Sequence, residues 1–303
     1  MSGSLVSVSS LWKSFKGNPV LKGIDFDLYP GEVYGLIGLN GTGKTTFLRT
    51  MLGILKPDKG GIEALGYNPE DADPGFYRRC GVVLENSGFY GDLSFIQNLR
   101  FYASAKGLRD EDLKRYIERY WSDTEIVAKG KKTRFFSRGQ KMIAALARAF
   151  AGSPDLCILD EPAVALDMNG YDTLKRLVAE RAEQGGCIII SSHQLDLIEN
   201  ICNRIGVLEE GTISDYNPER NEWVIRSDIN KGDFKRILSD TVGIADFTER
   251  GRHEFRVYAD VQEPDKGLSD LVKGLVSAGY RVFELRPAET TLQESMKDYY
   301  KRG

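Results

Sequence analysis

The run GLNGTGKTT at residues 38–46 limits what this chain can fold into more than any other feature. It matches G-x-x-x-x-G-K-[ST], in which glycines let successive backbone N–H groups turn toward a polyphosphate. The lysine supplies a mobile positive charge for the β- and γ-phosphates, and the following hydroxyl can ligate Mg²⁺. The candidate nucleotide-binding residues here are Gly38, Leu39, Asn40, Gly41, Thr42, Gly43, Lys44, Thr45 and Thr46.

The segments on either side of this loop have the character that the motif requires. Residues 32–37 predict a strand, and residues 46–52 predict a helix with apolar residues at 47, 48, 51 and 52. A helix that begins at the loop directs its N-terminal N–H groups at the phosphates. The sequence therefore predicts an α/β fold with a strand, a phosphate loop and a helix in succession.

A second group of residues lies at the end of the apolar run LCILDE, residues 156–161. A strand that is apolar throughout belongs in the buried middle of a parallel sheet, and its carboxyl end is where doubly wound folds bind ligands. Asp160 is placed to hold the Mg²⁺ shell. Glu161 points differently and can orient or deprotonate an attacking water.

Composition limits the kinds of partner and the cellular location that we expect for this chain. The net charge of −3 gives no basic footprint, so we expect no nucleic acid partner. We see neither a signal peptide nor an uncharged apolar stretch of about 20 residues, the length that spans a bilayer. The four cysteines lack C-x-x-C spacing and are interpreted as reduced thiols of a cytoplasmic protein. Any membrane role would come through a partner chain.

The run FSRGQ, residues 136–140, precedes an alanine-rich helix and lies shortly before the acidic strand. It resembles the L-S-G-G-Q signature of the ATP-binding cassette (ABC) family. Ser137, Gly139 and Gln140 match the signature, whereas Phe136 and Arg138 depart from it at its more variable places. The resemblance covers residues from about 5 to 213.

Other motifs follow in the order of that family. Residues 165–167, ALD, are similar to its D-loop. His193, after an apolar strand, resembles the switch histidine that contacts the γ-phosphate; the alternative is a capping or packing histidine. Phe15 matches the aromatic residue that stacks on adenine; the alternative is a core phenylalanine of a β-lobe. Glu85 stands where the family carries a glutamine that contacts Mg²⁺ and the attacking water.

The resemblance implies a reaction and its partners. Two ATPase chains, either two copies or two homologous subunits, would pair head to tail, with Ser137 and Gly139 of one closing over the γ-phosphate held by the other. Glu161, His193 and Lys44 would be catalytic. ATP and Mg²⁺ would be the cofactors, with Thr45, Glu85 and Asp160 as metal ligands. A polytopic permease would hold the chain at the inner face of the cell membrane.

The expected organisation has three parts. Residues 1–213 would be an ABC nucleotide-binding domain with an antiparallel β-lobe at 5–30 and a helical subdomain at about 88–145. Residues 214–222 are polar and predict a linker. Residues 223–303 predict a small ferredoxin-like α+β accessory domain with strands at 223–228, 241–247, 252–259 and 280–286 and helices at 232–240, 264–279 and 289–302.

The function that we expect is that of an ATP-hydrolysing subunit of an ABC transporter, specifically an exporter, driven by ATP-dependent closure of the dimer. Two alternatives stay open at this stage. One is an importer ATPase whose C-terminal domain senses a solute. The other is a non-transport ABC ATPase, against which stand the single cassette and the lack of basic patches.

Overall fold

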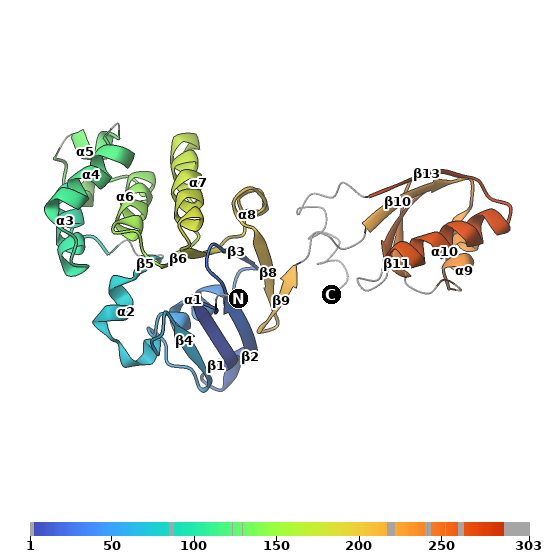
Figure 1. Cartoon of the computed structure of the whole chain (residues 1–303), viewed down its shortest axis with the longest axis horizontal. Helices are drawn as coiled ribbons and strands as arrows, with labels where there is room; N and C mark the ends of the chain where they lie inside the picture. Colours follow the sequence, from blue (N-terminus) through green and yellow to red (C-terminus); the bar gives the residue numbers. More distant parts are fainter. Residues whose placement is uncertain are drawn as a thin grey trace. The chain divides into compact units, whose positions relative to one another are not determined.

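The computed structural model describes residues 3–84, 88–122, 124–128, 130–216, 222–239, 241, 244–251, 253–259 and 264–287. The chain divides into two compact units, Met1–Tyr216 and Asn217–Gly303. We call them the first unit and the second unit. Both are drawn in Figure 1.

A six-stranded sheet forms the centre of the first unit, in the order β5-β6-β7-β3-β8-β9. The first five strands in that order are parallel, and β9 is antiparallel to β8. The middle strands are buried along their whole length because both faces of the sheet are covered. The strands are β3 Val33–Ile37, β5 Cys80–Val83, β6 Leu156–Asp160, β7 Cys187–Ser191, β8 Arg204–Glu209 and β9 Thr212–Tyr216.

Helix α1, Lys44–Met51, packs on one face of this sheet, between it and the β-lobe. The apolar residues of α1 share one buried cluster with both sheets, and Phe47 in that cluster is fully buried. Figure 1 shows α6 (Arg138–Phe150), α7 and α8 on the opposite face. The bounds of the last two are Met168–Glu183 and Leu195–Ile201.

The predicted antiparallel β-lobe consists of β1 Val6–Phe15 and β2 Asn18–Leu28, joined by a third strand, β4 Lys59–Ala64. The strand order is β2-β1-β4. A short 3-10 helix at Pro69–Asp71 and helix α2, Pro74–Arg78, lead from this lobe back to the central sheet.

The helical subdomain contains α3 Phe95–Ala105, α4 Asp110–Tyr120 and α5 Glu125–Ala128, followed by a 3-10 turn at Thr133–Phe135. Its first helix begins with a capping box between Ser94 and Gln97. Helix α6, Arg138–Phe150, runs past the predicted end of the subdomain at residue 145. It continues because residues 144–147, 149 and 150 are apolar and buried on more than one side of the helix.

The end of the first unit differs from the expected linker. Ser214–Tyr216 belong to β9, which pairs with β8 through backbone hydrogen bonds although its residues are mostly polar. An edge strand needs backbone partners on one side only, so its sequence is not marked by apolar residues. Residues 217–221 lie outside the described residues.

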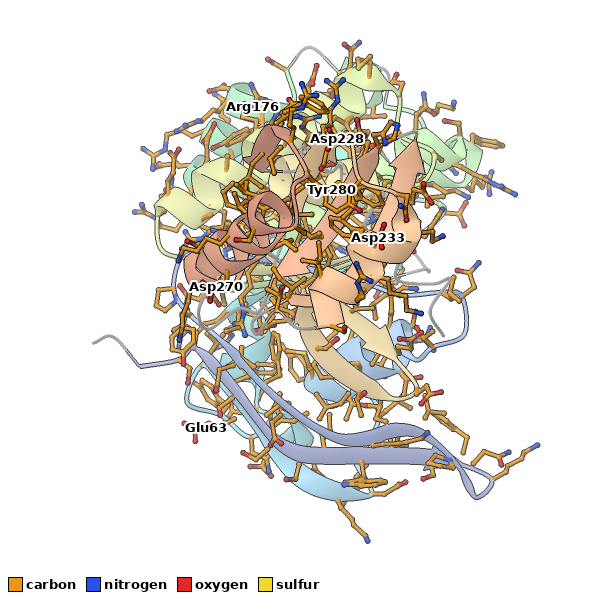
Figure 2. All side chains as sticks on the ribbon, turned by 90° about the vertical axis from the view of Figure 1, so that its right-hand side faces the viewer. Glu63, Arg176, Asp228, Asp233, Asp270 and Tyr280 are labelled. Carbon is orange, nitrogen blue, oxygen red and sulfur yellow. The ribbon has the colours of Figure 1, made fainter. Side chains whose placement is uncertain are left out.

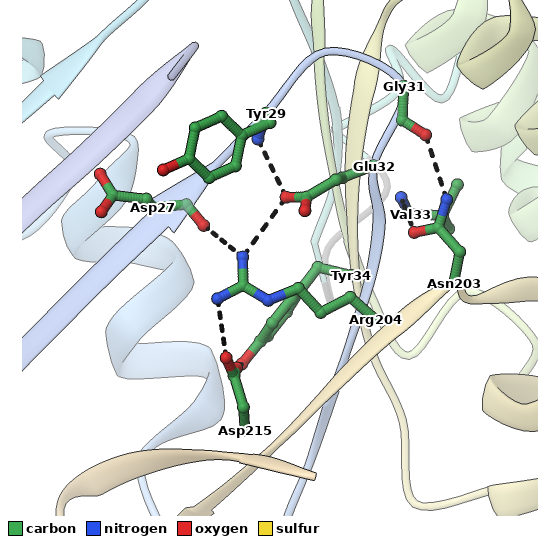
Figure 3. A network of polar contacts seen from close by, with 9 residues as sticks. All are labelled: Asp27, Tyr29, Gly31, Glu32, Val33, Tyr34, Asn203, Arg204 and Asp215. Atoms are coloured by element: carbon green, nitrogen blue, oxygen red, sulfur yellow. Dashed lines mark hydrogen bonds and ion pairs between the residues drawn. The ribbon is translucent and has the colours of Figure 1, made fainter. Parts of the chain in front are cut away.

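A polar network ties β9 to the rest of the sheet (Figure 3). Arg204 donates to the carbonyl oxygen of Asp27 at 2.8 Å and to Oδ2 of Asp215 at 2.9 Å. The hydroxyl of the fully buried Tyr34 donates to Oδ1 of Asp215 at 3.2 Å. One carboxylate on β9 therefore serves both a guanidinium from β8 and a phenol from β3.

The second unit has its own four-stranded antiparallel sheet in the order β11-β12-β10-β13, with a separate apolar core that includes Phe234 and Phe255. Tyr280 and Asp233, both labelled in Figure 2, are joined by a 2.7 Å hydrogen bond donated by the phenol. The elements are β10 Glu222–Ser227, α9 Lys231–Ser239, β11 Ile244–Gly251, β12 Glu254–Ala259, α10 Pro264–Ser277 and β13 Val282–Pro287.

We interpret the order β–α–β–β–α–β in this unit as a ferredoxin-like arrangement. The predicted strand at 241–247 begins three residues later, at Ile244, and extends to Gly251. The predicted helix at 289–302 lies outside the described residues.

Candidate nucleotide site

The loop between β3 and α1 needs glycine at several points. A Cβ on Gly38 would lie 2.6 Å from the carbonyl oxygen of Leu208, on the neighbouring strand β8. Gly41 and Gly43 have φ angles of 85° and 110°, a region that L side chains rarely adopt. The second of these glycines is the N-cap of α1, so the loop passes directly into this helix. The N-terminal N–H groups of a helix favour an anion such as phosphate.

The buried side chain of Lys44 folds back over the loop. Its Nζ donates to the carbonyl oxygens of Gly38 at 2.7 Å and Leu39 at 3.1 Å. Burial lowers the pKa of Lys44, and the carboxylates of Glu161 and Asp160 oppose that shift. The amine is therefore held beside the loop, within the electrostatic reach of both acidic residues predicted for the site.

Asp160 is buried at the end of β6, and both of its carboxylate oxygens accept hydrogen bonds. The Thr45 hydroxyl donates to Oδ2 at 2.9 Å and the Ser191 hydroxyl to Oδ1 at 2.5 Å. Sequence reasoning missed Ser191. The signal was present, because Ser191 ends the parallel strand β7 directly beside Asp160.

Glu161 adopts a φ of 50°, unusual for a residue with a side chain. The backbone N–H of Glu161 donates to two oxygens of Ser191, the carbonyl oxygen at 3.1 Å and the side-chain hydroxyl oxygen at 3.2 Å. Its carboxylate Oε2 lies 2.9 Å from Nδ1 of His193. Both side chains remain partly exposed, at 27% and 54%, so water can reach the pair.

A cavity of about 550 Å³, which we call the nucleotide cavity, is lined by nine of the predicted residues and by three that were not predicted, Val20, Met142 and Val164. Phe15 lines it and is 43% exposed, so its ring is not part of the β-lobe core. Gly38, Leu39 and Thr42 do not line the cavity. The predicted residues that do are Phe15, Asn40, Gly41, Gly43, Lys44, Thr45, Thr46, Asp160 and Glu161.

The signature residues line a different cavity, of about 580 Å³, together with the D-loop. The Ser137 side chain caps α6. The Gln140 side chain completes a capping box by accepting a hydrogen bond from the backbone N–H of Ser137 at 3.1 Å. A Cβ on Gly139 would lie 2.7 Å from the carbonyl oxygen of Ala165, so glycine is required where α6 meets the D-loop. Asp167 in turn caps α7.

The two cavities share no lining residue. Ser137, Gly139 and Gln140 therefore line no cavity together with the phosphate loop of the same chain. His193 contacts Glu161 without lining the nucleotide cavity. Glu85 lies outside the described residues. Among the helices that the structure describes, none combines the length and the apolar character needed to cross a bilayer.

Known proteins are similar to this chain in sequence and in fold. A family model described as ABC transporter matches residues 21–164. The bacitracin transport ATP-binding protein BcrA of Bacillus licheniformis is 30% identical over 310 residues, which cover 98% of this chain and 96% of BcrA. The uncharacterized ABC transporter ATP-binding protein MJ1023 of Methanocaldococcus jannaschii is 32% identical over 213 residues, covering 70% of this chain and 76% of that protein.

A solved ATP-binding subunit of an ABC transporter superposes with a TM-score of 0.68 at 26% identity, covering 78% of this chain and 94% of the other. The parallel sheet, the glycine loop and the acidic strand end define a phosphate-loop ATPase. Within that class, the chain belongs to the ABC transporter family, as an ATP-binding and ATP-hydrolysing subunit.

Proposed function

We propose that this chain energises an exporter by closing, around ATP, against a second copy of itself or a homologous ATPase subunit. The observation that carries the pairing of two chains is that the nucleotide cavity and the cavity lined by the signature residues have no residue in common. If Ser137 and Gly139 act on a nucleotide, that nucleotide is bound by another chain. Head-to-tail pairing would complete two sites at once.

Exposed apolar side chains support such pairing. Leu39 in the phosphate loop is 58% exposed, Val164 before the D-loop is 42% exposed and Met168 at the start of α7 is 76% exposed. These residues lie in or next to the two motifs that the closed dimer would bring together. Burying them between chains would add hydrophobic stabilisation to the contacts with ATP.

The donor set fits Mg²⁺. The Thr45 hydroxyl and the Asp160 carboxylate are oxygen donors 2.9 Å apart, and oxygen ligands suit this hard cation. Thr45 and Asp160 would hold the ion, with Glu85 as a third candidate from the sequence. Bound Mg²⁺ supplies charge neutralisation for the β- and γ-phosphates.

The roles of the remaining residues follow from their contacts. Lys44 would exchange its bonds to loop carbonyls for the phosphates of ATP. Glu161 would accept a proton from the attacking water or orient it, and His193 would hold the Glu161 carboxylate through its 2.9 Å contact. Ser191 would keep both the Asp160 carboxylate and the Glu161 backbone in place. Catalysis would then rest on positioning and electrostatics.

Transport requires a membrane partner. The alignment with BcrA, a bacitracin transport protein by name, extends over nearly the whole chain, including the second unit, and supports a role in transport. We propose a polytopic permease as the partner, which would place this chain at the inner face of the cell membrane. The direction of export is carried over from the family resemblance.

Affinity capture tests this function. The tagged full chain would be incubated with detergent-solubilised membranes of its own cells, with and without Mg·ATP, and the captured proteins identified by mass spectrometry. We expect one polytopic membrane protein that raises the ATPase rate of the chain when both are placed in liposomes. A chain that captures only soluble proteins would contradict the transport role.

A further inference from the structure

Phe15 reaches the nucleotide cavity from the β-lobe, where it is the last residue of β1. It pairs with Asn18 on β2 across a two-residue turn, Lys16 and Gly17, whose φ angles of 50° and 82° are both positive, as a tight hairpin requires. This hairpin fixes the backbone of Phe15 but not its ring, which is 43% exposed. The orientation of the ring therefore depends on the side chains beside it.

The ammonium group of Lys13 lies over one face of that ring. Its Nζ is 5.6 Å from the ring centroid, within the range of a cation–π contact. The Lys13 side chain is only 15% exposed, and it does not line the nucleotide cavity. An aromatic ring has two faces, so a cation on one of them leaves the other for a stacking partner. We therefore expect Lys13 to act on a bound base through Phe15.

The segment that joins α1 to β4 holds this ammonium group in place. Nζ of Lys13 donates to the carbonyl oxygen of Lys56 at 2.6 Å and to Oδ1 of Asp58 at 3.2 Å. Oδ2 of the same carboxylate accepts from the backbone N–H of Ser14 at 2.6 Å. The backbone N–H of Asp58 donates to the carbonyl oxygen of Trp12 at 2.8 Å. Asp58 thus bonds to three successive residues of β1.

These contacts connect the two ends of the nucleotide cavity. Helix α1 begins at Lys44 in the phosphate loop, and residues 56–58 follow its C-terminal end. Asp58 therefore joins the strand that presents Phe15 to the segment that follows the phosphate-loop helix. The hydrogen bond from Lys13 lowers the pKa of the Asp58 carboxyl, so this group stays ionised at neutral pH.

We propose that Lys13 is a positioning residue for the base of the nucleotide: its anchored ammonium holds the Phe15 ring in the orientation that stacks on adenine. The negative face of an aromatic ring attracts a cation, and the opposite face can stack on a base. The inference rests on the proposed function, and within it on the stacking of Phe15 on adenine that the family resemblance implies.

Binding of ATP and of inorganic tripolyphosphate to the full chain separates recognition of the base from recognition of the phosphates. Both ligands would be titrated calorimetrically in EDTA, which removes Mg²⁺ and suppresses hydrolysis. We expect Lys13→Met to weaken ATP binding about two- to fivefold, the effect of one cation–π contact, and to leave tripolyphosphate binding unchanged. Lys13→Arg keeps a cation and should retain the affinity for ATP.

A double-mutant cycle shows whether Lys13 acts through the ring. Phe15→Ala alone should weaken ATP binding about fivefold or more, because the stacking on the base is lost. Lys13→Met should cause no further loss in the Phe15→Ala background, because the ring that it positions is gone. Lys59→Met is the matched control: it changes an exposed lysine of the same sheet that does not line the cavity, and it should alter neither affinity.

Loss of ATP affinity in Lys13→Met that disappears in the Phe15→Ala background supports the proposal. Three results for Lys13→Met would overturn it: unaltered ATP affinity, an equal loss for ATP and tripolyphosphate, or an equal loss with and without the Phe15 ring. Unaltered ATP affinity in Phe15→Ala would overturn it as well. All of these outcomes leave the transport role standing, which a different result contradicts, namely capture of soluble proteins alone.

Discussion

Nδ1 of His193 lies 2.9 Å from Oε2 of Glu161, at the carboxyl ends of the neighbouring parallel strands β7 and β6. The same two strand ends place the Ser191 hydroxyl against Asp160. One strand thus supplies both acidic groups and the other supplies the side chains that orient them. The proposed metal ligand and the proposed base are consecutive residues, and contacts from Ser191 and His193 orient each of them separately.

Glu161→Gln should bind Mg·ATP and nearly abolish its hydrolysis. The amide keeps the shape of the side chain but cannot accept a proton from water, and loss of a general base slows turnover by ~10²–10⁴-fold. Phosphate release under saturating ATP measures the effect. ATP that is not hydrolysed should also hold the chains together, as a dimer on gel filtration.

Glu183→Gln serves as the matched control, since that carboxylate is exposed at the end of α7. It should leave turnover unchanged. Near-normal hydrolysis by Glu161→Gln would remove Glu161 from the mechanism.

Lys44→Ala should weaken nucleotide binding itself. The variant loses the charge that faces the phosphates and the two hydrogen bonds from Nζ to loop carbonyls. A charge-assisted hydrogen bond to phosphate corresponds to an affinity loss of about tenfold to a hundredfold. Calorimetric titration with ATP measures it, with the exposed Lys175→Ala as control. Unaltered ATP affinity in Lys44→Ala would contradict the assignment of the loop.

The sequence predicted those parts of the fold in which local pattern and burial agree. Strands β6 and β7 are apolar at nearly every position, which is typical of strands covered on both faces. The S-x-x-Q pattern from Ser137 to Gln140 predicts a helix start by itself, because both side chains satisfy backbone groups locally.

Features set by distant parts of the chain escaped prediction. Strand β4 contains two adjacent glycines and resembles a loop, yet a Cβ on Gly60 would lie only 2.3 Å from the carbonyl oxygen of Ser10 on β1. Met142 and Val164 reach the nucleotide cavity from two separate segments, and no local motif marks them. Strand β9 was missed because an edge strand gains its stability from backbone pairing.

Buried thiols should make the fold sensitive to alkali. Burial raises the pKa of Cys80 from 9.0 to about 12, and it has the same effect on Cys187 and Cys202. Because the folded state keeps these protons more tightly, its stability is fully present below about pH 9. That stability is lost as the pH rises toward 12, by about 1.4 kcal/mol per pH unit for each thiol.

Urea unfolding between pH 8 and pH 11 measures this loss. Cys80→Ala should lower stability at every pH through its lost contacts, but its stability should fall less steeply with pH than that of the unaltered chain. Equal slopes for the two proteins would show that ionisation of Cys80 does not contribute.

Glu85→Gln tests the point where the sequence departs from its family. If the Glu85 carboxylate lies near Mg²⁺ and the γ-phosphate, its charge opposes the charge of ATP and should slow hydrolysis. The glutamine removes that charge and adds a hydrogen-bond donor. We expect an equal or higher ATPase rate with weaker dependence on Mg²⁺ concentration. A collapse comparable to that of Glu161→Gln would assign Glu85 an essential catalytic role.

A chain ending at Tyr216 should fold and bind ATP, because the first unit has an apolar core that does not draw on the second. A chain ending at Ile213 should be less stable. It loses the Asp215 carboxylate, which accepts from Arg204 and from the buried Tyr34 hydroxyl. Leaving such a buried donor without an acceptor costs about 1–3 kcal/mol. Thermal unfolding of the two shortened chains measures the difference, and Asp215→Asn in the longer one, which keeps an acceptor oxygen, should fall between them. Equal stability of both shortened chains would show that the network in Figure 3 is not what secures β9.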